Sequence, residues 1–167
     1  HRFTIPDFWS KYNLSKGKYF VLTLHRPSNV DEILKLETLL DEIVKSTNGL
    51  KIIFPIHPRI KKDLIDRSAL PINFIFIDPQ PYLEFIYLIK NSFAVITDSG
   101  GLSEETTVLR VPCLTIRNTT ERPETVTLGT NQLITVNPKN FPKYFNNLFQ
   151  GKWDSGVTPP KWDGKSG

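Results

Sequence analysis

The stretch that decides the fold is AVITDSGGLSEE, residues 94–105. A short apolar run, AVIT, leads into a polar turn, DSGG, and then into a helix-forming segment with two adjacent glutamates. A helix that begins in glycine presents bare backbone N–H groups, which carry a partial positive charge and favour anions. The stretch therefore predicts a strand, a tight turn and a helix whose first turn is open to an anionic ligand.

Strand-like and helix-like segments alternate on both sides of this stretch. Apolar runs predict strands at residues 19–24, 51–56, 73–78, 93–97, 113–116 and 131–136. Helical patterns occupy residues 29–46, 58–68, 81–91, 100–110, 121–129 and 137–151. Because the strands are almost wholly apolar, both of their faces are expected to be covered, as in a parallel sheet. The alternation favours βαβ units and a doubly wound α/β fold with about six parallel strands.

The first long helix is expected to begin at Asn29. Asn29 can cap the helix, and Glu32 three residues later approximates a capping box. The apolar residues between Ile33 and Val44 then fall on one helical face, which predicts that this face is buried.

Composition limits the class of protein. The chain has 167 residues, of which 39% are hydrophobic and 23% charged, which fits one globular domain. It has no apolar run of about 18 residues, so a membrane span is not expected. The net charge of +4 favours an anionic partner, whereas the dispersed basic residues argue against nucleic acid. Cys113, the only cysteine, lies in an apolar run and is expected to be buried in a cytoplasmic protein without an internal disulfide.

Polar residues gather where the predicted strands end. His25 and Arg26 follow the first strand, and His57 follows the second, so two of the three histidines share this rim. Ligands of an open parallel sheet bind beyond the carboxyl ends of its strands. An isolated histidine is more often structural, but a place beside Arg26 favours a functional role for His25, as a general acid or a phosphate donor. Neither histidine has the spacing of a metal site.

The DSGG turn and the glutamates suggest two parts of one ligand. Gly100 and Gly101 would let a phosphate approach the backbone, and Ser99 can cap the helix or donate to a phosphate oxygen. A ribose presents two hydroxyl donors to an acceptor-only carboxylate, so Glu104 or Glu105 would suit a nucleoside diphosphate. The alternative is an ordinary capped turn with acidic residues in the first helical turn. No GxGxxG or GxxxxGK[ST] motif occurs, which disfavours a redox dinucleotide or a P-loop nucleotide.

Five stretches in sequence order resemble the non-hydrolysing UDP-N-acetylglucosamine 2-epimerases, which have the glycosyltransferase-B fold. They are LTLHRPSNVD, FPIHPR, IDPQPYLEFIYLI, ITDSGGLSEE and RNTTERPETVTLGTNQL. The family has two Rossmann-like domains with the active site between them. The resemblance implies that this chain is the C-terminal, nucleotide-holding half, and it implies neither a cofactor nor a metal.

The resemblance also assigns roles. It makes His25 the catalytic histidine near the departing phosphate, and it makes Arg26 and His57 contacts to a second, regulatory UDP-GlcNAc. The UDP-binding residues that it implies are Phe85 at the uracil pocket, Ser99, Gly100 and Gly101 at the diphosphate, Glu105 at the ribose and Arg122 in the sugar-diphosphate cleft.

The chain lacks Met, opens at His1 and ends in a polar stretch, so we expect a fragment of a longer protein. We divide it into an entry segment at residues 1–18, a nucleotide-binding domain at residues 19–151 and a truncated tail at residues 152–167. The expected partners are UDP, UDP-GlcNAc, the N-terminal domain of the same protein and, at full length, a second copy of the protein.

The implied reaction interconverts UDP-GlcNAc and UDP-ManNAc by elimination and re-addition of UDP. The proton-transfer carboxylates of the family lie in its N-terminal domain, so this chain alone is expected to bind UDP without turnover. The alternatives that stay open are a hydrolysing or modified-sugar 2-epimerase, a glycosyltransferase of the same fold and a non-enzymatic binding module.

Overall fold

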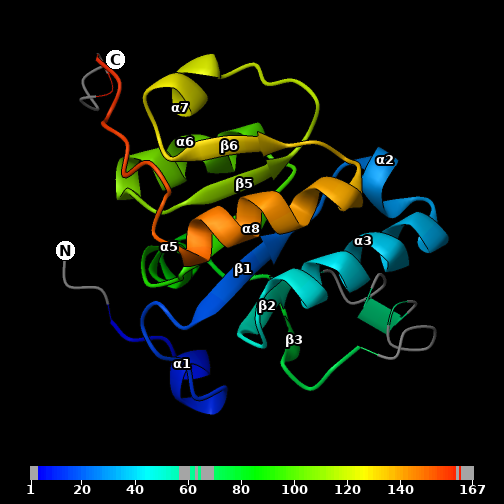
Figure 1. Ribbon diagram of the computed structural model, residues 1–167. Coiled ribbons are helices and arrows are strands. Elements are labelled where there is room, and N and C mark those ends of the chain that lie inside the picture. Colours follow the sequence, from blue (N-terminus) through cyan, green and yellow to red (C-terminus); the bar gives the residue numbers. More distant parts are fainter. Residues whose placement is uncertain (1–3, 57–60, 63, 65–69, 161, 163–167) are drawn as a thin grey trace.

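The computed structural model describes residues 4–56, 61–62, 64, 70–160 and 162 (Figure 1). Its strands are β1 (Tyr19–Thr23), β2 (Lys51–Pro55), β3 (Phe74–Ile77), β4 (Ala94–Thr97), β5 (Cys113–Ile116) and β6 (Asn131–Ile134). They form one sheet in the order β3-β2-β1-β4-β5-β6, and every pair is parallel. The predicted doubly wound sheet of six parallel strands is therefore confirmed, and its order reverses between β1 and β4.

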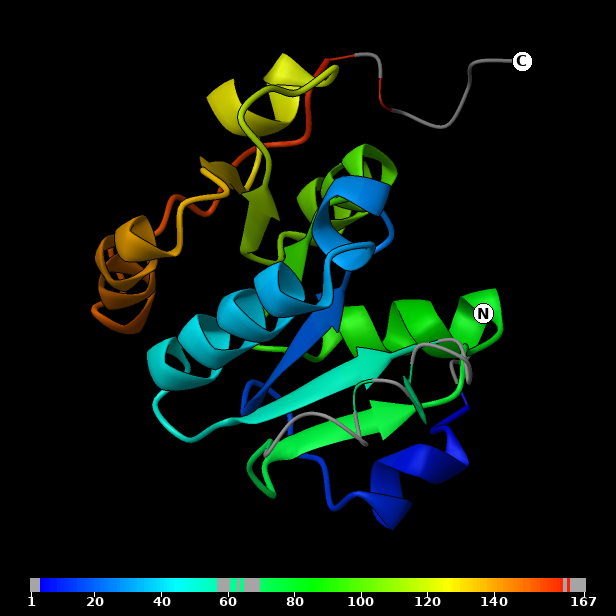
Figure 2. The ribbon, with the colours of Figure 1, turned by 90° about the vertical axis from the view of Figure 1, so that its right-hand side faces the viewer.

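Helices cover both faces of the sheet. They are α1 (Asp7–Lys11), α2 (Pro27–Val30), α3 (Ile33–Ser46), α5 (Tyr82–Lys90), α6 (Gly100–Leu109), α7 (Pro123–Thr127), the 3₁₀ turn η1 (Pro138–Asn140) and α8 (Phe141–Phe149). Figures 1 and 2 show α3 and α8 on one side of the sheet and α5 on the other. The predicted helix at residues 58–68 lies largely outside the described residues.

The central strand β1 shows why these strands are apolar throughout. Phe20 and Leu22 belong to the layer packed under α3 and α8, whereas Tyr19 and Val21 belong to the layer under α1 and α5. All four side chains are fully buried. A strand covered on both faces has no solvent side on which polar residues would alternate.

The predicted capping box at Asn29 is wrong. The chain forms the short helix α2 first and then starts α3 at Ile33, and Glu32 makes no side-chain capping bond. Asn29 is buried and donates from Nδ2 to the carboxylate of Asp98, at 2.9 Å. A partner 69 residues away in sequence, at the end of β4, has taken the side chain that would otherwise cap the helix. The predicted apolar face of the helix is confirmed, since Leu36, Leu40 and Ile43 are buried in α3.

Residues on either side of 19–151 also pack against the domain. Phe8 of α1 is buried in the same layer as Tyr19. After α8, Trp153 donates from Nε1 to the carbonyl of Thr130, at 2.8 Å, and Val157 N–H donates to the carbonyl of Leu128. Parts of both flanking segments therefore belong to the folded unit in this structure.

Cys113 lies in β5 and is fully buried, as predicted. Burial raises the pKa of its thiol to about 11. No helix among the described residues has the length and apolar character needed to cross a membrane.

Candidate functional site

The reversal of strand order places two loops side by side at the carboxyl edge of the sheet. One loop follows β1 and the other follows β4, and ligands of doubly wound folds bind at this switch point. A hollow of about 550 Å³ lies between the loops. Its walls are His25 and Arg26 from the first loop with Pro27 and Ser28 at the start of α2, and Asp98 and Ser99 from the second loop with Gly100 at the start of α6.

A smaller hollow of about 260 Å³ adjoins the first and shares His25 with it. Its other walls are Thr23, Leu24, Pro55, Ile56, Pro79, Gln80 and Phe85. The walls of the smaller hollow are mostly apolar, whereas the wall of the larger hollow includes the N terminus of α6. The pair of hollows therefore joins an apolar compartment to one that has a helix N terminus in its wall.

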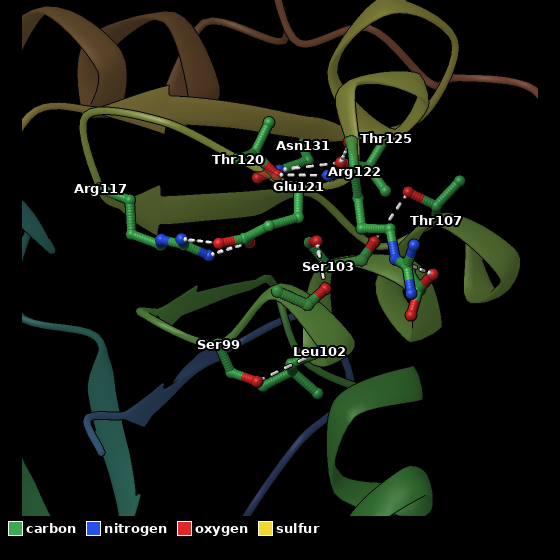
Figure 3. A network of polar contacts seen from close by, with 12 residues as sticks. Ser99, Leu102, Ser103, Thr107, Arg117, Thr120, Glu121, Arg122, Thr125 and Asn131 are labelled. Carbon is green, nitrogen blue, oxygen red and sulfur yellow. Dashed lines mark hydrogen bonds and ion pairs between the residues drawn. The ribbon is translucent and has the colours of Figure 1, made fainter. Parts of the chain in front are cut away.

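The N terminus of α6 is built as predicted from the DSGG turn. Ser99 is the N-cap residue, and its Oγ accepts a hydrogen bond from Leu102 N at 3.4 Å (Figure 3). The helix then starts with Gly100 and Gly101, neither of which has a positive φ. The cap leaves the remaining first-turn N–H groups of α6 without intrahelical partners, as at every helix start.

Gly100 and Gly101 are not required by packing. A Cβ atom at Gly100 would lie 3.5 Å from Arg117 and Glu121, and one at Gly101 would lie 3.9 Å from Ser99 Oγ, which are ordinary contacts. At Gly129, by contrast, a Cβ atom would lie 2.4 Å from Thr107 Oγ1. Packing therefore leaves room for a Cβ atom at Gly100 and at Gly101, and the lack of side chains there uncovers the first-turn backbone of α6, which a phosphate group could approach.

Asp98 ties the two loops together. Its carboxylate is fully buried and accepts hydrogen bonds from His25 N at 3.0 Å and from Arg26 N at 2.9 Å. The Asn29 amide donates to the same group. The position of Asp98 directly after a strand was evident from the sequence, but no role was predicted for it.

Arginine side chains converge beside Gly100. Arg117, buried at the end of β5, donates both ends of its guanidinium to Glu121, at 2.7 and 2.5 Å (Figure 3). Arg26 Nη2 lies 3.9 Å from the same carboxylate. Hydrogen bonding to Arg117 lowers the pKa of Glu121 to about 2. The sequence places Arg117 directly after a strand, but no role was predicted for it, since its ion pair depends on the turn after β5.

The Glu121 carboxylate is expected to make the stability of the fold decrease at acid pH. Its folded pKa of about 2 lies below the ordinary value of 4.5, so its contribution is complete above about pH 4.5 and declines as the pH falls. The Glu121→Gln variant is expected to lose less thermal stability than the unchanged chain between about pH 6 and pH 3. Thermal unfolding followed at a series of pH values checks this, and identical acid profiles would contradict it.

The two adjacent glutamates have different partners. Successive helical residues point about 100° apart, and Glu104 pairs with Arg122 Nε at 2.6 Å whereas Glu105 faces α5. The Tyr82 hydroxyl donates to both Glu105 oxygens at 3.3 Å, which is long for such a bond. Burial raises the pKa of Glu105. Glu105 is therefore the glutamate with weakly engaged oxygens.

The structure brings together some of the predicted site residues. His25, Arg26, Ser99 and Gly100 line the larger hollow, and Phe85 lines the smaller one. The residues that line neither are Gly101, Glu105 and Arg122. His57 lies outside the described residues. Within the described part of the chain, no group of three or more His, Cys, Asp or Glu residues is placed to hold a metal ion.

Comparison with known proteins shows which family this chain resembles. The model of the UDP-N-acetylglucosamine 2-epimerase family matches residues 3–167. The chain is 40% identical over 158 residues to the UDP-N-acetylglucosamine 2-epimerase of Methanocaldococcus jannaschii, and 44% identical over 160 residues to that of Methanococcus maripaludis. These matches cover 89% and 90% of this chain and 42% of each relative.

A solved structure of the Methanocaldococcus jannaschii enzyme, in complex with UDP-GlcNAc and UDP, is similar with a TM-score of 0.74 at 38% identity. That similarity covers 89% of this chain and 44% of the solved one, so this chain spans less than half the length of its relatives. The predicted glycosyltransferase-B assignment is confirmed by these structural neighbours. From the family match and these identities, the chain belongs to the UDP-N-acetylglucosamine 2-epimerase family.

Proposed function

We propose that this chain is the UDP-holding domain of an enzyme that interconverts UDP-GlcNAc and UDP-ManNAc. The observation that carries the proposal is the start of α6, where two glycines leave space that packing does not need. This space adjoins the hollow at the switch point of the sheet. Family membership supports a UDP-sugar as the ligand of this site.

The proposed pose places the diphosphate and the ribose of UDP along α6 and the uracil beside α5. The diphosphate lies against Ser99, Gly100 and Gly101, where N–H groups and the helix dipole offset its charge. The ribose hydroxyls donate to Glu105, and the uracil enters the smaller hollow beside Phe85. The apolar character of that hollow supports a planar base, and the long Tyr82 contact leaves Glu105 able to exchange partners.

The proposed reaction uses the positive rim of the site. UDP leaves C1 of the sugar as a proton leaves C2, which gives 2-acetamidoglucal, and UDP returns to C1 as a proton is added to the other face of C2. Negative charge grows on the UDP oxygen as the C1–O bond breaks. His25 from the β1 loop and Arg122 before α7 would stabilise that charge, whereas Arg26 is proposed to contact a second, regulatory UDP-GlcNAc. The proton-transfer carboxylates are proposed to come from the part of the protein beyond this chain.

Product analysis in D₂O tests this proposal. With UDP-GlcNAc as substrate, this chain alone is expected to form no UDP-ManNAc, whereas the full-length protein forms it with deuterium at C2. Release of free ManNAc by the full-length protein would instead indicate a hydrolysing enzyme, and sugar transfer to an acceptor would indicate a glycosyltransferase. Turnover by this chain alone would contradict the assignment of the proton-transfer groups.

A further inference from the structure

We propose that Asp98 is a positioning residue that holds the two walls of the larger hollow at a fixed separation. This inference rests on the proposed function for its ligand, UDP. It assigns to Asp98 no contact with UDP and no step of the reaction. Its effect passes through the backbone of His25 and Arg26 on one wall and through Ser99, its neighbour in sequence, on the other.

The contacts of Asp98 reach both walls. Its two carboxylate oxygens accept His25 N–H at 3.0 and 3.1 Å, and one of them also accepts Arg26 N–H at 2.9 Å. The buried Asn29 side chain adds a third donor at 2.9 Å. In return, Arg26 Nε donates to the backbone carbonyl of Asp98 at 3.2 Å. The segment from His25 to Asn29, which includes the start of α2, is therefore attached by two backbone N–H groups and two side chains.

A second set of hydrogen bonds links the two walls at the ends of β1 and β4. Thr23, the last residue of β1, and Thr97, the last residue of β4, form a buried hydrogen bond between their hydroxyls at 2.7 Å. Ser99 N–H donates to the Thr97 hydroxyl at 3.0 Å. These two hydrogen bonds fix Ser99, the N-cap of α6, relative to the end of β1. The hydrogen bonds of Asp98 fix His25 and Arg26 relative to the same point.

The chemistry of the site requires a carboxylate. Three N–H donors converge on Asp98, and an ionised carboxylate offers only acceptors. Asparagine has the same shape but only one accepting oxygen, so its NH₂ group would face an N–H donor at about the same distance. The buried charge is compensated by charge-assisted hydrogen bonds, which a neutral amide does not form. Asp98→Asn therefore releases the β1 loop while keeping the volume of the side chain.

The test compares Asp98→Asn with Asn73→Ala, both in this chain. The Asn73 side chain donates to the carbonyl of Leu50 at 3.0 Å, before β2 and β3, at the opposite edge of the sheet. We expect UDP affinity, measured by calorimetry where circular dichroism shows a folded chain, to fall at least about fivefold in Asp98→Asn and less than about twofold in Asn73→Ala. Amide exchange of His25 and Arg26, followed by NMR, is expected to accelerate only in Asp98→Asn.

Two results would overturn the proposal. One is an Asp98→Asn variant that binds UDP as tightly as the unchanged chain, and the other is unchanged exchange at both amides. If the unchanged chain does not bind UDP, the proposed function of the site fails for this chain, and amide exchange alone decides whether Asp98 fixes the loop. If Asp98→Asn does not fold, Asn29→Ala removes one donor, and faster exchange at Arg26 is then the expected result, with unchanged exchange overturning the proposal.

Discussion

Replacing Glu105 with alanine is expected to weaken UDP binding by about 30- to 100-fold. The carboxylate would accept both ribose hydroxyls, and a hydrogen bond to a charged group is worth about 1.5–3 kcal/mol. Because Glu105 is only half-buried, water offsets part of the loss in the variant, and a net cost of about 2–2.7 kcal/mol corresponds to about 30- to 100-fold. Burial already raises the pKa of Glu105, which indicates that the charge is partly removed from water before any ligand arrives. Calorimetric titration of the unchanged chain and the variant with UDP measures the difference.

Two matched variants separate this effect from a general loss of negative charge. Glu104→Ala removes the neighbouring carboxylate, which already pairs with Arg122, and is expected to cost less UDP affinity than Glu105→Ala. Glu42→Ala removes a carboxylate that pairs with Lys45 on α3, away from the site, and is expected to leave binding unchanged. A greater loss of UDP affinity in Glu104→Ala than in Glu105→Ala would show that the proposed contact between Glu105 and the ribose is wrong.

Replacing both Gly100 and Gly101 with alanine is expected to lower UDP affinity at least about tenfold while leaving the fold at least as stable. The new Cβ atoms meet no atom closer than 3.5 Å, so the protein accommodates them. Alanine also reduces the entropy of the unfolded chain, which is worth about 0.4–1 kcal/mol per compatible site. The same methyl groups stand where a diphosphate would approach the helix backbone.

Thermal unfolding measures the stability of the double variant, and UDP titration of the same sample measures its affinity. Gly129→Ala is the contrasting control, because its Cβ atom would come within 2.4 Å of Thr107 Oγ1 and 2.5 Å of the Thr125 carbonyl. That variant is expected to lose stability. Full UDP affinity in the double alanine variant would show that the glycines serve a turn and not a ligand.

The sheet could be predicted from sequence because its signals are local. An apolar run such as residues 19–24 specifies a strand covered on both faces, and helical periodicity between Ile33 and Ser46 specifies the helix that covers it. Ser99 was predictable as a cap for the same reason, since its partner is Leu102, three residues away. Each of these features depends on residues within a few positions of one another.

The parts that sequence analysis missed depend on distant partners. Asn29 has a good capping composition, but Asp98 lies 69 residues further along the chain, and its buried charge outweighs a helix cap. The division of labour between Glu104 and Glu105 likewise depends on Arg122 and Tyr82, which come from other elements. No local pattern records which of two neighbouring carboxylates meets a guanidinium after the chain has folded.

The burial of Cys113 makes this chain convenient for labelling. Its thiol is the only one in the sequence, is fully buried and has a pKa raised to about 11, so it is shielded from maleimides at neutral pH. A cysteine introduced at an exposed position such as Ser28 would then react alone, without removal of the native one. Fluorophores or spin labels placed in this way would report directly on UDP binding at the rim of the sheet.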